Sequence, residues 1–201
     1  MTKEGLFLLK EKEIEKLNKK IINEHEDQEI VLGNGSVQSR LILIGEAPGA
    51  KEVEAKLPFV GQAGKHLEEF LNILELDRKE LYITNTVKFR PTRISSKTGG
   101  KINRAPSKKE IENFKEYLFD EIEIIQPQVI VTLGNVPLKT ITRNEKDKIG
   151  DLHGNAIKVN IKNREYNVFP LYHPAAVIYR RELKDIYMED LKKLKKFKEN
   201  K

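Results

Sequence analysis

The sequence contains no cysteine among its 201 residues. This absence excludes a disulfide scaffold, a thiolate zinc site, a cysteine-held iron-sulfur cluster and a cysteine nucleophile. Long apolar runs are also missing, since the longest has about five residues against the roughly 20 that a membrane-spanning helix needs. The N-terminal stretch interrupts its apolar residues with charges after a few positions, unlike a secretion signal. We therefore expect a cytoplasmic protein with no membrane partner.

Length and composition predict one folded domain over residues 1–201. Apolar residues make up 38% and charged residues 34% of the chain, yet the apolar residues form runs too regular for a disordered protein. The sequence has no internal repeat, no low-complexity tract and no linker long enough to divide it. A chain of this length buries a real core without staples, so we expect a soluble monomer. Nothing in the sequence names a protein partner.

Positive charge is concentrated in one stretch that lacks acidic residues. The chain carries a net charge of +6, and residues 86–109 contain eight basic residues and no acid. These residues are Lys88, Arg90, Arg93, Lys97, Lys101, Arg104, Lys108 and Lys109. We interpret this stretch as a loop that faces phosphates. The basic tail from residue 180 to residue 201 also contains acids, and we favour the solvated face of a terminal helix there.

The hydrophobic pattern predicts a three-layer α/β sandwich, with a mostly parallel four-stranded central sheet flanked by helices. All-apolar runs at 41–44 and 129–133 are typical of strands that are covered on both faces. Helical spacing of apolar residues predicts core-facing helices at 67–74 and 107–125, the second with a capping-box start. The remaining predicted elements are helices at 10–22 and 182–198, a strand at 81–87, and a hairpin of strands 157–161 and 166–172.

Polar side chains follow several of the predicted strands. Glu46, Asn85 and His173 lie at or just beyond the carboxyl ends of strands, where such sheets bind ligands. Asn85 offers both a donor and an acceptor, as the edge of a pyrimidine requires. Each residue also has a plain structural interpretation: a solvated carboxylate for Glu46 and a backbone-bonded imidazole for His173. No other histidine has ligand spacing to His173, so we expect no metal site.

Five motifs occur in an order that resembles the uracil-DNA glycosylase superfamily, and family 4 within it. They are Gly-Glu-Ala-Pro-Gly-x-x-Glu, Pro-Phe-Val-Gly-x-Ala-Gly, Tyr-Ile-Thr-Asn-x-Val-Lys-x-Arg-Pro, Val-Ile-Val-x-Leu-Gly and Tyr-His-Pro-Ala-Ala. The resemblance extends from about Leu41 to Leu191. It implies an enzyme that flips a uracil out of DNA into a pocket at the strand ends and hydrolyses its glycosidic bond in base-excision repair.

The resemblance also implies a role for each matching residue that would touch the base. Phe59 would stack on the uracil ring, although filling the core is the commoner fate of a phenylalanine. Asn85 would read the N3 and O4 edge. His173 would donate a hydrogen bond to O2, where negative charge accumulates as the glycosidic bond breaks. These three side chains are therefore the predicted uracil-binding set, with His173 also catalytic.

Three further residues have implied roles around the reacting bond. Glu46 would orient the attacking water or stabilise the sugar cation, which makes it the second predicted catalytic residue. Glu52 matches the position that crowds the pyrimidine C5 and rejects the methyl group of thymine. The main-chain amide of Ala47 would add a hydrogen bond to the base.

The predicted DNA contacts come from two segments. The loop that starts at His173 resembles the family loop that enters the minor groove and fills the space left by the flipped base. Ile178 and Tyr179 would be its wedges, with Arg180 and Arg181 on adjacent phosphates, although the segment could simply lead to the last helix. From the basic stretch we predict DNA contacts by Lys88, Arg90, Lys97, Lys101 and Arg104.

The chain departs from the family pattern in two places. Family 4 enzymes typically hold a four-cysteine [4Fe-4S] cluster, and here Phe89 and Phe114 stand at two of the ligand positions. We therefore predict no cofactor, with these aromatics and the N-terminal helix filling the volume of the cluster. Residues 92–101 form a longer link than is usual in the family, which we interpret as a mobile insertion that contacts DNA. It contains no histidine, so we do not expect the covalent capture known in one related group.

Two other functions remain open at this point. One is a glycosylase for another deaminated base, such as hypoxanthine or xanthine. The other is a non-catalytic DNA-binding module with the same fold.

Overall fold

The central sheet has six strands in the part of the chain that the computed structural model describes, residues 2–180 and 182–199. Its strand order is β1-β3-β2-β6-β8-β7. The strands are β1 (Asn34–Gly35), β2 (Leu41–Gly45), β3 (Tyr82–Asn85), β6 (Val129–Leu133), β7 (Ile157–Ile161) and β8 (Arg164–Leu171). The four inner strands are parallel, whereas β1 and β7 pair antiparallel at the two edges.

The α/β sandwich class is confirmed, but the predicted count of four strands was wrong. The four inner strands are the parallel core, the edge strand β7 is the first arm of the predicted hairpin, and the other edge strand, β1, was not expected. β1 is only two residues long, too short for any apolar pattern to indicate it. β7 alternates between exposed and buried positions, as an edge strand with one face in solvent does, and it pairs with β8 in the expected hairpin.

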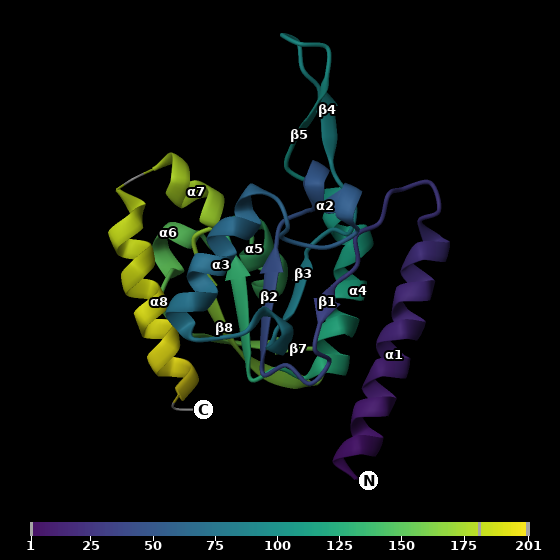
Figure 1. Ribbon diagram of the computed structural model, residues 1–201, viewed down its shortest axis with the longest axis vertical. Helices are drawn as coiled ribbons and strands as arrows, with labels where there is room; N and C mark the ends of the chain where they lie inside the picture. The colour runs from purple at the N-terminus through teal and green to yellow at the C-terminus, as the bar shows by residue number, and fades with distance from the viewer. Residues whose placement is uncertain (1, 181, 200–201) are drawn as a thin grey trace.

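Helices cover both faces of the sheet (Figure 1). They are α1 (Lys3–Glu24), α2 (Ala50–Ala55), α3 (Gln62–Leu74), α4 (Lys108–Ile125), α5 (Asn135–Thr142), α6 (Ile149–Leu152), α7 (Pro174–Tyr179) and α8 (Leu183–Glu199), with a short 3-10 helix, η1, at Arg78–Glu80. The alternation of side chains along β2 divides the core between two layers. Leu41 and Leu43 pack with residues of α3 and α8, whereas Ile42 and Ile44 pack with residues of α1 and α4.

The residues at the ends of α4 explain where this helix begins and ends. The side chain of Ser107 accepts a hydrogen bond from Glu110 N, and the carboxylate of Glu110 accepts one from Ser107 N. Gln126 adopts a left-handed conformation directly before Pro127 and ends the helix. The predicted capping box is therefore confirmed.

Residues 92–103 form a β-hairpin that stands out from the body of the protein (Figure 1). Its strands are β4 (Thr92–Ile94) and β5 (Lys101–Asn103), which pair antiparallel and belong to no larger sheet. The sequence predicted a mobile insertion at 92–101 but no strands here, since three-residue strands show no periodicity. The hairpin starts close to the carboxyl ends of the parallel strands, the edge at which a ligand site is expected. None of the helices in the described residues is long and apolar enough to cross a membrane.

Candidate active site

A cavity of about 380 Å³ lies at the carboxyl ends of the parallel strands. We call it the rim pocket, and its lining residues are Ala47, Gly49, Ala50, Lys51, Glu52, Phe59, Gly61, Gln62, Ala63, Asn85, Asn103, His173 and Ala175. Five predicted site residues line it together, although they come from separate loops, a strand end and a helix start: Ala47, Glu52, Phe59, Asn85 and His173. The convergence expected from the order of the strands is therefore present.

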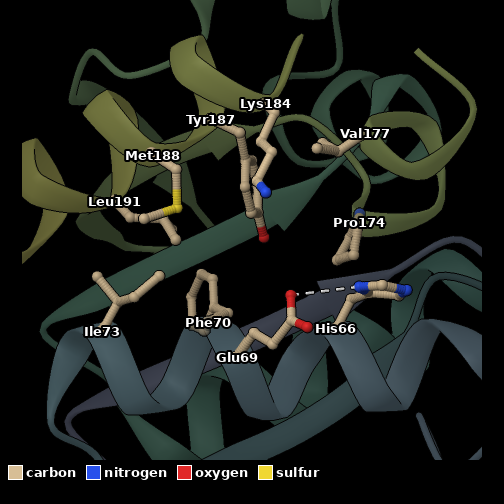
Figure 2. Close-up of a pocket in the computed structure, with 10 residues that line it drawn as sticks. All are labelled: His66, Glu69, Phe70, Ile73, Pro174, Val177, Lys184, Tyr187, Met188 and Leu191. Carbon is tan, nitrogen blue, oxygen red and sulfur yellow. Dashed lines mark hydrogen bonds and ion pairs between the residues drawn. The ribbon is translucent and has the colours of Figure 1, made fainter. Parts of the chain in front are cut away.

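A second cavity, of about 270 Å³, lies between α3, α7 and α8 (Figure 2). Its floor is apolar, and Figure 2 shows the hydroxyl of Tyr187 pointing towards α3, where His66 and Glu69 form an ion pair. None of the predicted site residues lines this cavity. The chemistry predicted from the sequence therefore belongs to the rim pocket.

Asn85 occupies the last position of β3, opposite Gly45 on β2. Only 2% of its surface is exposed, and its Nδ2 has no hydrogen-bond partner within the described residues. A buried amide donor without a partner is costly unless a ligand satisfies it. A Cβ at position 45 would lie 2.4 Å from Asn85 Oδ1, so glycine is what leaves room for this amide. The arrangement suits a ligand that presents both an acceptor and a donor.

Phe59 lies beside Asn85 in a strained backbone conformation. Its φ of 54° falls in the left-handed region, which is unfavourable for an aromatic residue. The guanidinium of Arg78 holds this conformation, because Nη1 donates to Phe59 O at 3.1 Å and Nη2 donates to Pro58 O at 2.5 Å. The ring centroids of Phe59 and His173 are 6.1 Å apart. Phe59 also packs in the core cluster around β2, so it fills the core and lines the pocket at once.

Glu52 connects the two loops that form one wall of the rim pocket. Its Oε2 accepts a hydrogen bond from Gly49 N at 3.1 Å. Its Oε1 accepts from Val60 N at 3.1 Å and from Gly61 N at 2.6 Å. The carboxylate therefore fixes the loop that carries Phe59 to the start of α2. This role was not visible in the sequence, because the three amides lie up to nine residues away.

His173 caps the N-terminus of α7 and presents a neutral ring to the pocket. Its Nδ1 accepts a hydrogen bond from Ala175 N at 3.2 Å, so the proton of the neutral ring is on Nε2. Burial lowers the pKa of His173 to about 4. At neutral pH the side chain is therefore an uncharged donor. Nδ1 therefore makes the backbone hydrogen bond of the structural interpretation, and Nε2 is left to donate to a ligand.

Glu46 does not line the rim pocket, although its neighbour Ala47 does. The side chain is half-buried, and desolvation raises the pKa of its carboxyl above the usual value. Its backbone carbonyl accepts a hydrogen bond from Val87 N, which fixes this loop to the segment after β3. A catalytic role for Glu46 remains a prediction.

Asn103 is a pocket residue to which sequence reasoning assigned no role. It ends β5, and its Oδ1 accepts a hydrogen bond from Arg90 Nε at 2.7 Å. Because Oδ1 has this partner, the amide donor Nδ2 is the atom free to face a ligand. The only sequence feature that could have indicated a role for Asn103 was the motif Asn103-Arg104-x-Pro106, which follows the insertion. Arg90, predicted to contact DNA, is therefore in a position to orient the Asn103 amide.

Lys88 was predicted to contact DNA, and its position contradicts that prediction. Its side chain is completely buried, and Nζ donates to Glu121 Oε2 at 2.6 Å, to Thr84 Oγ1 at 2.6 Å and to Asn85 O at 2.9 Å. Burial lowers the pKa of Lys88, and the charge of Glu121 opposes this shift. A basic residue in a basic stretch resembles a phosphate ligand, and its buried partner 33 residues away on α4 gave no sequence signal.

The other predicted DNA contacts differ in their surroundings. Arg104 forms a two-bond ion pair with Glu110, which holds the pKa of that carboxyl at about 2. Lys97 and Lys101 are exposed on the hairpin, and Arg180 is exposed after α7. The backbone of Ile178 and Tyr179 belongs to α7, but their side chains lie outside the described part of the structure, as does the whole of Arg181.

Aromatic rings pack together at Phe89 and Phe114, the two positions where the resemblance places cluster ligands. The rings of Phe89 and Phe114 have centroids 5.6 Å apart, and His25 stacks on Phe114 at 4.3 Å. Leu17 and Ile21 of α1 complete this apolar cluster. The two aromatics and the N-terminal helix therefore pack together, and their filling of a cluster's volume stays a prediction. With phenylalanines at two ligand positions and no cysteine in the sequence, the residues do not fit a cysteine-held cluster.

The comparisons with known proteins agree with this geometry. Residues 32–196 match the family model of the uracil DNA glycosylase superfamily. The chain therefore belongs to this superfamily.

Within the superfamily, the chain is similar to several proteins named Type-4 uracil-DNA glycosylase. It is 38% identical over 169 residues to the one from Sulfurisphaera tokodaii, which covers 82% of this chain and 73% of the relative. It is 37% identical over 167 residues to the one from Archaeoglobus fulgidus, with 82% and 79% covered. For the one from Thermotoga maritima the identity is 35% over 170 residues, with 84% and 82% covered.

Proposed function

We propose that the protein is a uracil-DNA glycosylase that hydrolyses the bond between uracil and deoxyribose in DNA. One observation carries the proposal: the unpartnered amide donor of Asn85 and the neutral imidazole of His173 meet in one pocket beside Phe59. Uracil presents an acceptor at O4, a donor at N3 and an acceptor at O2, in this order along one edge. Asn85 Nδ2 and Oδ1 complement the first two, and His173 Nε2 complements the third.

The rate enhancement comes mainly from stabilising the leaving group. As the glycosidic bond breaks, the electron pair goes to uracil, the sugar becomes an oxocarbenium-like cation, and water adds to C1′. A preorganised donor at O2 acts where the negative charge develops, and a neutral His173 does so without first losing a proton. Phe59 holds the ring plane, and Glu46 orients the water or stabilises the cation. The products are free uracil and an abasic site.

Selection of uracil over thymine depends on the wall that Glu52 builds. The three hydrogen bonds from backbone amides keep this side chain and its loop fixed. A wall that cannot move away rejects the additional methyl group at C5 by steric overlap. The main-chain amide of Ala47 lies in the same pocket and adds a hydrogen bond to the base.

We further propose that the enzyme works as a cytoplasmic monomer, with residues 1–201 as one domain and uracil-containing DNA as its partner. No step of this mechanism needs a second chain or a metal ion. Lys97 and Lys101 of the hairpin and Arg180 bind the DNA backbone, while α7 approaches the minor groove.

The test is uracil release from U:G, U:A and single-stranded oligonucleotides, with hypoxanthine- and xanthine-containing strands in parallel. Removal of one transition-state donor costs about 10²- to 10³-fold in rate, so we expect His173→Ala to lose this much and Asn85→Ala to lose uracil recognition. His66→Ala, a change in a half-buried histidine of α3 that does not line the rim pocket, is the matched control and should keep wild-type activity. Wild-type protein that releases no uracil from any substrate would refute the proposal. Release of purines alone would identify the alternative glycosylase.

A further inference from the structure

The β4–β5 hairpin has a defined shape up to its tip. Ser95 N donates to Gly100 O at 2.9 Å, and Gly99 N donates to Ser95 O at 2.9 Å. Gly99 has a φ of 68°, a left-handed conformation that glycine adopts without strain. The tip is therefore closed by its own backbone hydrogen bonds, next to the paired strands.

The base of the hairpin is fixed to the body of the protein by Arg104. Its backbone N donates to Pro91 O at 3.1 Å, and its Nε donates to Thr92 O at 3.1 Å. The guanidinium also donates to both carboxylate oxygens of Glu110, in the first turn of α4. Arg104 was predicted to contact phosphate, but its hydrogen bonds to these partners instead fix the hairpin to α4. The position of the hairpin relative to the rim pocket is therefore set by the fold.

The register of the hairpin determines which of its side chains face the rim pocket. Thr92 pairs with Asn103, and Ile94 pairs with Lys101. Residues two apart on a strand, and residues directly opposite in an antiparallel pair, lie on the same face. Asn103 lines the rim pocket, so Ile94 and Lys101 lie on the pocket-side face of the arm. Arg93 and Ile102 lie on the other face, and Ile102 is only partly exposed.

The pocket-side face combines one apolar side chain with cations. Ile94 is 64% exposed, the highest value among the large hydrophobic residues in the described part of the chain. Lys101 on the same face and Lys97 at the tip are exposed. Proteins that grip single strands use aromatic side chains as stacking platforms, and residues 92–103 contain no aromatic residue. An aliphatic side chain beside lysines is instead typical of proteins that press on the base steps and phosphates of a duplex.

We propose that the hairpin is a second DNA-gripping element, which binds the duplex beside the flipped nucleotide on the side opposite to α7. Ile94 packs against the groove, and Lys101 contacts a phosphate. Figure 1 shows the hairpin and α7 at the same edge of the sheet, well apart. The extended part of the hairpin from Thr92 to Ser95 spans about 10 Å at 3.3 Å per residue, or roughly three base-pair steps of 3.4 Å. This inference rests on the proposed function and adds a preference for double-stranded substrate.

The test compares Lys101→Gln with Arg93→Gln, because both remove one charge from the same hairpin on opposite faces. Binding is measured against salt concentration, with duplex and single-stranded oligonucleotides that carry a non-hydrolysable 2′-fluoro deoxyuridine. One lost phosphate contact lowers the log-log salt slope by about 0.9, which is about eightfold in affinity at 0.1 M salt. We expect this loss for Lys101→Gln on duplex, and less than twofold for Arg93→Gln. Ile94→Ser should lower kcat/KM on duplex and leave single-strand excision unchanged.

Two results would overturn the inference. The first is an equal loss for Lys101→Gln and Arg93→Gln, and the second is an equal loss on duplex and single-stranded substrates. None of the three residues lines the rim pocket, so each variant should keep single-strand excision. That measurement is the control for an intact pocket. A wild-type protein that releases no uracil refutes the proposed function instead, so the two failures are distinguishable.

Discussion

Gly45→Ala provides a strict test of the rim pocket, because a single methyl group enters between the two side chains that are proposed to hold uracil. A Cβ at this position would lie 2.4 Å from Asn85 Oδ1 and 2.5 Å from Phe59 Cζ. Ordinary Cβ contacts begin at 3.4 Å, so each neighbour is about 1 Å too close. At least one of the two side chains must move by about this distance.

The surroundings of Gly45 decide where the displacement goes. The ring of Phe59 cannot retreat with its backbone, because Arg78 and Glu52 hold the loop on both sides of it. Asn85 is at the end of a paired strand, where Lys88 Nζ donates to its carbonyl. Overpacking of this kind costs about 1–3 kcal/mol of stability. A misplacement of about 1 Å at a reacting centre costs about 10²-fold in rate.

We therefore expect Gly45→Ala to lower single-turnover uracil excision about 100-fold, while urea unfolding shows a protein that is still folded. Gly150→Ala in α6 is the matched control, since its Cβ would meet nothing closer than Tyr172 Oη at 3.8 Å. That variant should keep wild-type excision. A folded Gly45→Ala protein with wild-type kcat/KM would show that Asn85 and Phe59 do not act on the substrate from the positions described.

Two further predictions concern buried ionisable groups. Because burial lowers the pKa of His173 to about 4, the unfolded chain binds a proton near pH 6.5 that the folded chain does not bind until pH 4. The free energy of unfolding should therefore fall by up to about 3 kcal/mol as the pH falls through this window. It should fall by less in His173→Asn, which lacks the titrating group. Urea titrations at pH 7 and 4.5 measure both falls, and identical falls in the two proteins would contradict the assignment. Lys88→Met leaves the Glu121 carboxylate buried without its cation and should cost about 3–5 kcal/mol. Lys88→Met/Glu121→Gln should recover part of this loss, and equal losses in urea unfolding would contradict the ion-pair argument.

The sequence was sufficient for the parallel core of the sheet and for most of the rim pocket. All-apolar runs such as 41–44 have one physical explanation in a chain of this length, namely strands buried on both faces. Parallel strands bring their carboxyl ends to the same edge, so Asn85 and His173 were predictable neighbours. The edge strand β7 was also predicted, at 157–161 in the hairpin, whereas β1 was missed because it is only two residues long.

Partners that are distant in sequence were beyond a single sequence. The sequence shows the charge of Lys88, but it does not show that Lys88 forms a buried ion pair with Glu121. The same holds for Arg104. Its partner Glu110 lies just past the acid-free stretch and forms an ion pair with the guanidinium, which neutralises its charge. Composition therefore overestimated the DNA-facing charge of residues 86–109. Two of the predicted phosphate ligands, Lys88 and Arg104, instead hold the fold together. The exposed hairpin lysines remain as predicted DNA contacts.

The aromatic cluster at Phe89 and Phe114 connects the missing cysteines to the pocket. A fully buried phenylalanine contributes about 1.5–3 kcal/mol through apolar burial, and each well-placed aromatic pair adds about 0.5–1.5 kcal/mol. Ala47 packs against this cluster and also lines the rim pocket, while Val87 of the cluster donates its backbone N–H to Glu46 O. Packing of the aromatic side chains thus supports the loop that carries Glu46 and Ala47 from behind. Because neither Phe89 nor Phe114 lines the pocket, a metal-free support of this kind is compatible with the same chemistry on uracil.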